Sequence, residues 1–141
     1  LLRCRSAGAV PAMLADGRAS SLSKRLEQGD ELTPKLIAEE AEAGDPFSNE
    51  VVFDIARFMA VGTVNMMCIV HPAAVLLGGA MTFGGHRKPL GRGFLARIGE
   101  EVERLAPPGL CQMPHIDFAS LGGDAGYIGA AGVARLEYQK S

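Results

Sequence analysis

The sequence predicts one α/β lobe in which helices alternate with two short strands. Its 141 residues suit a single domain or one lobe of a larger protein. Hydrophobic residues make up 48% and charged residues 21%, as in globular proteins and unlike disordered ones. Helical and strand patterns also follow one another along the chain, and such alternation is typical of layered α/β folds.

The N-terminal residues 1–31 contain small, charged and turn-forming residues without a sustained period, so we expect an irregular segment there. A short helix near residues 9–15 is the one regular element it could contain. The regular lobe is expected over residues 32–141. Its first helix begins after Thr33, whose hydroxyl can accept a hydrogen bond from a free amide, and it ends near Gly44.

A long helix is predicted to begin at Asp45-Pro46 and to continue to about Ile69, because Asp is a good cap and Pro suits the first turn. Its apolar residues are spaced by three, four or multiples of these numbers, as on one helix face. They are Phe47, Val51, Ile55, Phe58, Met66 and Ile69. Near its end the helix is apolar on every side, including Cys68, so we expect that end to be buried all round.

The chain carries no Asp, Glu, Lys or Arg between Arg57 and Arg87, which raises the question of a membrane span. However, Asn65 lies inside this stretch, and His71-Pro72 interrupts it. We therefore expect no membrane span and a cytoplasmic protein.

Two strands and two further helices are predicted after the long helix. The apolar run 73–77, which ends at Gly78-Gly79, predicts a buried strand. A glycine-rich, basic loop is expected over 84–93, followed by a helix over 94–105. Residues 115–119 alternate between polar and apolar, as in a half-buried strand. Two strands are few for a sheet, and together with the start at Leu1 this suggests that the chain is a fragment.

The last helix is expected after Asp124, which can cap it, and it continues to about Tyr138. It begins with the small residues of the segment Gly122 to Ala131. A glycine inside a helix costs about 1 kcal/mol relative to alanine, so Gly126, Gly129 and Gly132 indicate either close packing or a hinge.

Gly78-Gly79-Ala80 is the other glycine cluster, and it follows directly on the expected buried strand. Without a Cβ, such a pair lets a flat ligand lie against the backbone, and ligands of open α/β sheets bind beyond the carboxyl ends of strands. A simple tight turn is the alternative. A phosphate-loop motif is absent, because Gly85 and His86 stand where Lys and Ser or Thr are required.

Charge and cysteine content exclude several classes of function. A net charge of −2 excludes a globally basic nucleic-acid binder. A local basic patch could attract phosphate, although such a run is also typical of a solvated loop; it consists of His86, Arg87, Lys88, Arg92 and Arg97. The three cysteines are widely spaced, and His71 and His115 lack partners at ligand spacing, so no metal site and no catalytic base are predicted.

Taken in order, these segments resemble the C-terminal lobe of the ROK family (repressors, open reading frames and sugar kinases) over roughly residues 30–136. The turn Ala43 to Pro46 is followed by Gly62-x-x-Asn65 and then by the segment His71 to Ala80. The segment Gly122 to Ala131 is similar to the family's Gly-x-Asp-Ala-Gly-x-x-Gly-Ala-Ala.

The resemblance implies an actin-like ATPase fold, also called ribonuclease H-like, in which two lobes close on ATP with Mg²⁺. It implies that Gly78, Gly79 and Ala80 line the adenosine pocket, and that Gly129 and Ala130 belong to the hinge between lobes. The implied reaction is transfer of the ATP γ-phosphate to a hexose, with glucose as the default substrate. The family's catalytic Asp, its phosphate loop and its zinc motif are not in this chain, so the chain alone is expected to be inactive.

Two other functions are compatible with the resemblance. The lobe could be the sugar-sensing part of a ROK transcriptional repressor, in which case nucleic acid would be a further partner. It could also be a non-catalytic assembly module that forms a homo-oligomer through the long helix.

Overall fold

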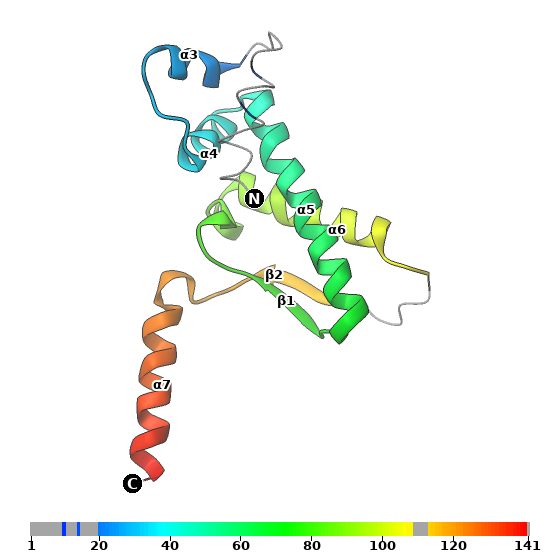
Figure 1. Cartoon of the computed structure of the whole chain (residues 1–141), viewed down its shortest axis with the longest axis vertical. Coiled ribbons are helices and arrows are strands. Elements are labelled where there is room, and N and C mark those ends of the chain that lie inside the picture. The colour runs from blue at the N-terminus through cyan, green and yellow to red at the C-terminus, as the bar shows by residue number, and fades with distance from the viewer. Residues whose placement is uncertain (1–9, 11–13, 15–19, 109–112, 141) are drawn as a thin grey trace.

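The computed structural model describes residues 10, 14, 20–108 and 113–140, which form a helical body, a small sheet and a protruding last helix (Figure 1). The body consists of α3 (Ser21–Glu27), α4 (Pro34–Glu42), α5 (Pro46–Val70) and α6 (Pro89–Leu105). The short helix expected near residues 9–15 lies largely outside the described residues. The start of the lobe at residue 32 stays a prediction.

Helix α3 corrects the expectation of an irregular segment over residues 1–31. The Ser20 hydroxyl accepts a hydrogen bond from the Leu22 amide at 3.1 Å and so caps the helix. Leu22 is fully buried in the core. A helix of seven residues is too short to show a clear period, and contacts with the rest of the fold stabilise it.

The predicted starts of α4 and α5 are confirmed. Thr33 Oγ1 accepts from the Leu36 amide at 3.1 Å, and Asp45 Oδ2 accepts from the Ser48 amide at 2.8 Å. Both helices have proline in the first turn. The α5 helix ends at Val70, and His71, which follows it, adopts a left-handed conformation with φ 47°.

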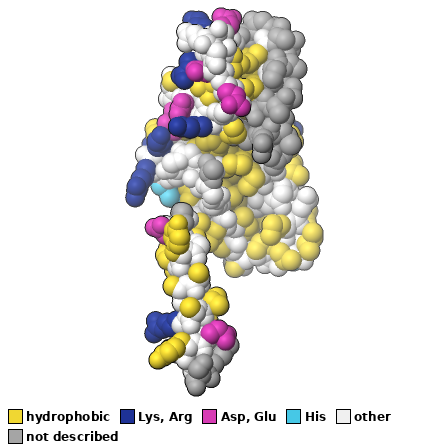
Figure 2. Space-filling view, turned by 60° about the vertical axis from the view of Figure 1, so that its left-hand side comes forward, with side chains coloured by type: hydrophobic (Ala, Val, Ile, Leu, Met, Phe, Trp, Pro, Cys, Tyr) yellow, Lys and Arg dark blue, Asp and Glu magenta, His cyan; other side chains and the backbone are white. Residues whose placement is uncertain are grey.

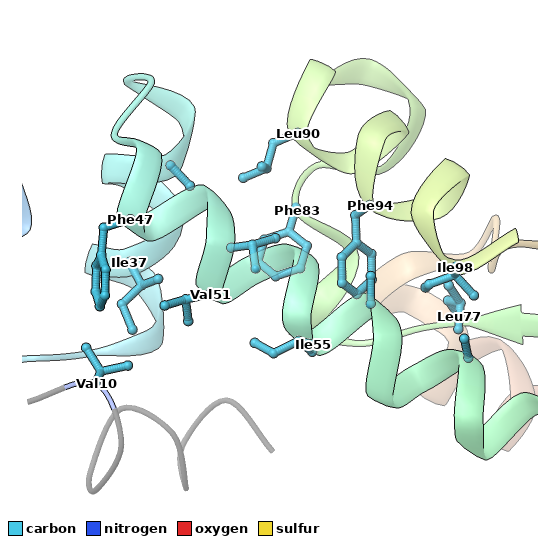
Figure 3. Close-up of a cluster of buried hydrophobic side chains, with 14 of the residues drawn as sticks. Val10, Ile37, Phe47, Val51, Ile55, Leu77, Phe83, Leu90, Phe94 and Ile98 are labelled. Carbon is cyan, nitrogen blue, oxygen red and sulfur yellow. The ribbon is translucent and has the colours of Figure 1, made fainter. Parts of the chain in front are cut away.

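The core lies where α5 packs against α4 on one side and α6 on the other (Figure 3). Ile37 comes from α4, Val51 and Ile55 from α5, and Phe94 and Ile98 from α6, and all are almost completely buried. Among the described helices, only α5 is long and apolar enough to cross a membrane, but its apolar stripe forms this core instead. That the protein has no membrane span stays a prediction.

The end of α5 is not buried all round, so that expectation was wrong. Ile69 is 77% exposed, Met66 and Val70 are also exposed, and Cys68 lies at the surface rather than in the core. The physical reason is that neighbouring elements cover one face only, where Met67 is buried.

Strands β1 (Ala74–Leu77) and β2 (His115–Phe118) pair in parallel, with Leu77 opposite Phe118. β1 is not the buried strand that its apolar sequence predicted, because only Leu77 is buried and Leu76 is 61% exposed. One face of the sheet, with Leu77, Ile116 and Phe118, packs on the helical body, and no described residue covers the other face at Leu76. The half-burial expected for β2 is confirmed at Ile116 and Phe118.

The loop predicted over 84–93 is shorter than expected, because α6 begins at Pro89. Before it, the chain forms two short 3₁₀ helices, η2 (Ala80–Thr82) and η3 (Gly85–Arg87). Gly91 and Gly93, which suggested a loop, lie inside α6. A Cβ on Gly91 would lie 2.3 Å from the Gly85 carbonyl oxygen, so glycine there permits close packing of η3 on α6.

Helix α7 (Ala125–Lys140) follows the 3₁₀ helix η4 (Gly122–Asp124) and extends away from the body (Figures 1 and 2). Its described side chains are exposed along the whole length. A Cβ added at Gly126, Gly129 or Gly132 would meet nothing within 4 Å. Within the described residues, these glycines therefore do not serve close packing.

Candidate functional site

A pocket of about 790 Å³ lies at the edge of the sheet where both parallel strands end. The segments that follow parallel strands lie at the same edge of the sheet, beyond the carboxyl ends of the strands. Ligands of α/β folds bind at this edge. The lining comes from the segments after β1 and β2 and from η2 and η3. The residues are Gly78, Gly79, Thr82, Gly84, Gly85, His86, Arg87, Asp117, Phe118, Ala119, Ser120 and Gly122.

Gly78 and Gly79, predicted from the sequence to line a ligand pocket, both lie on this wall. Gly79 has φ 82° and ψ −160°, a conformation that is essentially restricted to glycine. A Cβ built on Gly79 would meet nothing within 4 Å, and one on Gly78 would lie 3.7 Å from the Ala119 Cβ. The two glycines therefore present bare backbone to the pocket, and neighbouring side chains do not fill the space beside them. Ala80, the third predicted residue, follows directly and begins η2.

Phe83 anchors the loop that forms another part of the pocket wall. Its backbone has φ 49°, which is unusual for a residue other than glycine. Its ring is buried and contacts Phe94 of α6 edge-on, with ring centroids 4.8 Å apart. Packing of this ring holds the loop between η2 and η3 against the body.

His86 and Asp117 connect the loop wall to strand β2. His86 Nε2 lies 2.6 Å from Asp117 Oδ1, and the same oxygen accepts from the Phe118 amide at 2.7 Å. The Phe118 amide and the His86 side chain together lower the pKa of Asp117, although partial burial acts in the opposite direction. The imidazole also meets the Phe118 ring edge-on at 5.3 Å.

The sequence does not reveal this pair, since His86 stands out there only as part of a basic patch. The two residues are 31 positions apart, and only the strand register and the position of η3 bring them together. No local pattern signals such a contact.

The basic patch predicted from the sequence is divided in the structure. His86 and Arg87 line the pocket, whereas Lys88 Nζ pairs with Glu42 of α4 at 2.9 and 2.6 Å from the two carboxylate oxygens. Arg92 donates to the His86 carbonyl at 2.9 Å, and Arg97 pairs with Glu101 at 2.8 Å. Lys88 lines a second, smaller cavity of about 470 Å³ between α4, α5 and α6.

Gly129 and Ala130, the predicted hinge residues, lie inside α7 and are exposed. They do not belong to the described lining of the pocket, although Gly122, just before α7, does. The structure thus brings Gly78 and Gly79 together with the start of the second small-residue segment, but not with its helical part.

In the parts of the chain that the structure describes, no group of three or more His, Cys, Asp or Glu side chains is placed to hold a metal ion. The groups that the pocket offers to a ligand are polar side chains and bare glycine backbone. Those groups suit a ligand that combines a flat surface with hydrogen-bonding or charged groups.

Comparison with known sequences gives a match to the family model "ROK family" over residues 4–137. The chain is 25% identical over 124 residues to a glucokinase from Halalkalibacterium halodurans, and this covers 88% of the chain and 36% of the relative. It is 27% identical over 78 residues to a xylose repressor from Caldicellulosiruptor bescii, which covers 55% of the chain and 18% of the relative. The chain thus spans about a third or less of these relatives.

Two solved structures are similar. A protein assigned as a sugar kinase from Cytophaga hutchinsonii superposes with a TM-score of 0.71 at 26% identity, over 95% of this chain and 40% of that one. A ROK family glucokinase from Streptomyces griseus, in complex with glucose and AMPPNP, gives a TM-score of 0.63 at 30% identity, over 76% of this chain and 33% of that one. The predicted fold class, an actin-like ATPase fold that is helix-rich with a small sheet, is confirmed by this likeness.

Proposed function

The chain belongs to the ROK family, and on that premise we propose that it forms the nucleotide-binding, C-terminal lobe of an ATP-dependent hexose kinase. Glucose is the first candidate substrate, because relatives with this fold include glucokinases. We propose a cytoplasmic location for it, because ATP is available there.

One observation carries the proposal: the bare backbone of Gly78 and Gly79 faces the pocket where β1 and β2 end. A purine is flat, and a wall without Cβ atoms lets it approach the backbone closely. In the proposed complex the adenosine lies against Gly78, Gly79 and Ala80. The glucokinase from Streptomyces griseus supports this choice of ligand, since it was solved with AMPPNP.

The role of this lobe is to bind and orient the nucleotide. ATP with Mg²⁺ supplies the γ-phosphoryl group that is transferred to a sugar hydroxyl, and such transfer depends mainly on positioning and electrostatics. The described residues of this chain supply no base beside the pocket other than His86 and Asp117, and these two bind each other. The catalytic base and the metal ligands are therefore assigned to another part of the kinase.

The exposed helix α7 is proposed to lie at the hinge between lobes, with Gly129 and Ala130 at the contact. Its glycines have no neighbours within 4 Å of an added Cβ, so an approaching lobe could come close to the backbone. We also propose that copies of the protein associate through the exposed end of α5, which makes the kinase a homo-oligomer.

Titration of ATP into the purified chain by calorimetry tests the proposal. We expect saturable binding, and we expect that Gly78→Leu, which fills the pocket beside Ala119, reduces affinity about tenfold or more. Gly62→Leu is the control, because Gly62 lies in α5 away from the pocket and has open space around it. A chain that binds no ATP, or equal affinity in both variants, would contradict the proposal.

Activity is tested at two levels. The chain alone is expected to form no hexose phosphate, whereas the complete kinase is expected to release ADP only when sugar is present. Sugar-phosphate production by the chain alone would show that the base lies within it.

A sugar-sensing repressor lobe is the second candidate function, since a xylose repressor is among the relatives. That function predicts sugar-dependent binding of operator DNA by the complete protein and no turnover of ATP. An electrophoretic mobility assay with and without sugar, beside the ADP assay, separates the two.

A further inference from the structure

Three consecutive basic residues, His86, Arg87 and Lys88, close η3 and lead into α6. The outer two are each tied to a carboxylate of a different element. His86 contacts Asp117 of β2 at 2.6 Å, and Lys88 Nζ lies 2.6 Å from the nearer carboxylate oxygen of Glu42 in α4. These two pairs hold the backbone of the tripeptide from both sides.

The middle residue, Arg87, differs from its neighbours. It lines the 790 Å³ pocket and is exposed, and none of the described carboxylates is paired with its guanidinium. Asp117 is the one carboxylate on the described lining, and it already accepts from His86 and from the Phe118 amide. Arg87 thus leaves a positive charge at the pocket whose partner is not supplied by the described protein.

We propose that Arg87 is the residue by which this pocket recognises the phosphate groups of the nucleotide, a proposal that rests on the ATP-binding function above. A guanidinium has five N–H donors in a planar arrangement that matches two phosphate oxygens at once. The two anchored neighbours already fix the backbone at Arg87, so little backbone conformational entropy is lost when a ligand binds. Asp117 does not compete for the guanidinium of Arg87, because its Oδ1 is already engaged by the Phe118 amide and His86.

Arg87→Gln in the whole chain tests this inference, with affinities measured by calorimetry for ATP, AMP, adenosine and inorganic phosphate. We expect the affinity for ATP to fall about tenfold or more, as for a lost charge-assisted hydrogen bond. The affinity for adenosine should stay unchanged. The salt dependence of ATP binding should also weaken, since one charge contact is lost.

Two further variants separate the charge from its place in the fold. Arg135→Gln removes the same charge from α7, outside the described lining, and should leave every affinity unchanged. Arg87→Lys keeps the charge without the planar fork, so it should retain part of the ATP affinity. Circular dichroism of each variant establishes that it is folded.

The outcomes are distinguishable. If Arg87→Gln leaves ATP affinity unchanged, or lowers ATP and adenosine affinity equally, the phosphate role is wrong; the second result would point to stacking on the base. If inorganic phosphate binds the wild-type chain as tightly as ATP does, the residue serves a free-anion site and the proposal is overturned. If the wild-type chain binds neither adenosine nor ATP, the proposed function itself fails, and this inference fails with it.

Discussion

Asp45 shows how a single carboxylate joins two helices. It is buried at the start of α5, where it accepts from the Ser48 amide and also from the Ser20 hydroxyl and the Ser21 amide, both at 2.9 Å. Burial by itself raises the pKa of Asp45, but hydrogen bonds from Ser48, Ser21 and Ser20 outweigh it and lower the pKa. The cap could be predicted from the Asp-Pro sequence, whereas the connection to α3 could not.

Asp45→Ala should lower the free energy of unfolding by about 1–2 kcal/mol near pH 7, because the cap and the connection to α3 are lost. The ionised carboxylate stabilises the fold only while it is charged. Since its pKa is lowered in the folded state, this contribution is present above the unfolded-state pKa and is lost as pH falls through the folded-state pKa. Urea unfolding at about pH 7 and about pH 3 should therefore show a smaller difference from wild type at the acidic pH.

Thr33→Ala is the control for this experiment. It removes the cap of α4 through an uncharged hydroxyl, so its cost should not depend on pH in the same way. A difference between wild type and Asp45→Ala that grows on acidification would contradict the assigned ionisation state.

At the scale of elements, the pocket wall depends on how closely η3 approaches α6. A Cβ on Gly91 would lie 2.3 Å from the Gly85 carbonyl oxygen and 2.9 Å from the Thr82 carbonyl oxygen. Both neighbours are backbone atoms, which cannot rotate away as a flexible side chain can. Glycine at this position in the first turn of α6 therefore allows the loop that carries His86 and Arg87 to pack where it does.

Gly91→Ala should destabilise the protein by about 1–3 kcal/mol, as overpacking does, and should weaken ligand binding by shifting the loop. Gly99→Ala is the matched variant in the same helix, where an added Cβ meets nothing within 4 Å. It should stabilise the protein by about 0.5–1 kcal/mol, because alanine favours the helix. Denaturation midpoints of both variants measure the difference, and stabilisation of both would show that η3 is not held against α6.

The strongest contrast among the elements is between α6 and α7. The apolar residues of α6 form a stripe that enters the core, and its buried members are Leu90, Phe94, Ile98 and Val102. Helix α7 has no such stripe, and its apolar residues, including Ile128 and Leu136, are exposed. An isolated helix of this length is only marginally stable in water, and the apolar residues of α7 are uncovered by the described chain, so α7 is suited to contact something beyond the described residues.

At the scale of the whole molecule, apolar side chains lie at the surface on the lower part of the body and along the last helix (Figure 2). The C-terminal half of α5 contributes the exposed residues Phe58, Val61, Met66, Ile69 and Val70. Contiguous apolar patches on protein surfaces often mark interfaces. This distribution supports the proposed association through α5.

Ile69→Glu should shift the protein from oligomer toward monomer, because it places a charge in an apolar contact. Asn65→Glu introduces the same charge at an exposed polar position of the same helix and should have a smaller effect. Sedimentation equilibrium over a range of concentrations measures the association of each variant. Equal association of wild type and Ile69→Glu would show that this end of α5 is not the interface.

The sequence by itself determined the order of α4 to α7 and of the two strands, and most of their boundaries, but it did not reveal α3 or the start of α6 at Pro89. Caps such as Thr33 and Asp45, apolar periods and glycine pairs act over a few residues, so they are visible along the chain. The two glycine-bearing segments also indicated where the pocket lies, and Gly78, Gly79 and Gly122 do meet there.

Only the tertiary structure decided which apolar surfaces are covered and which charged groups meet. The exposure of Ile69 and Leu76 and the His86–Asp117 pair were not foreseeable. The hydrophobicity of a residue determines how strongly it favours burial, but it does not determine whether a neighbouring element is present to cover it. Contacts between residues far apart in sequence depend on strand register and helix packing, which no local pattern records.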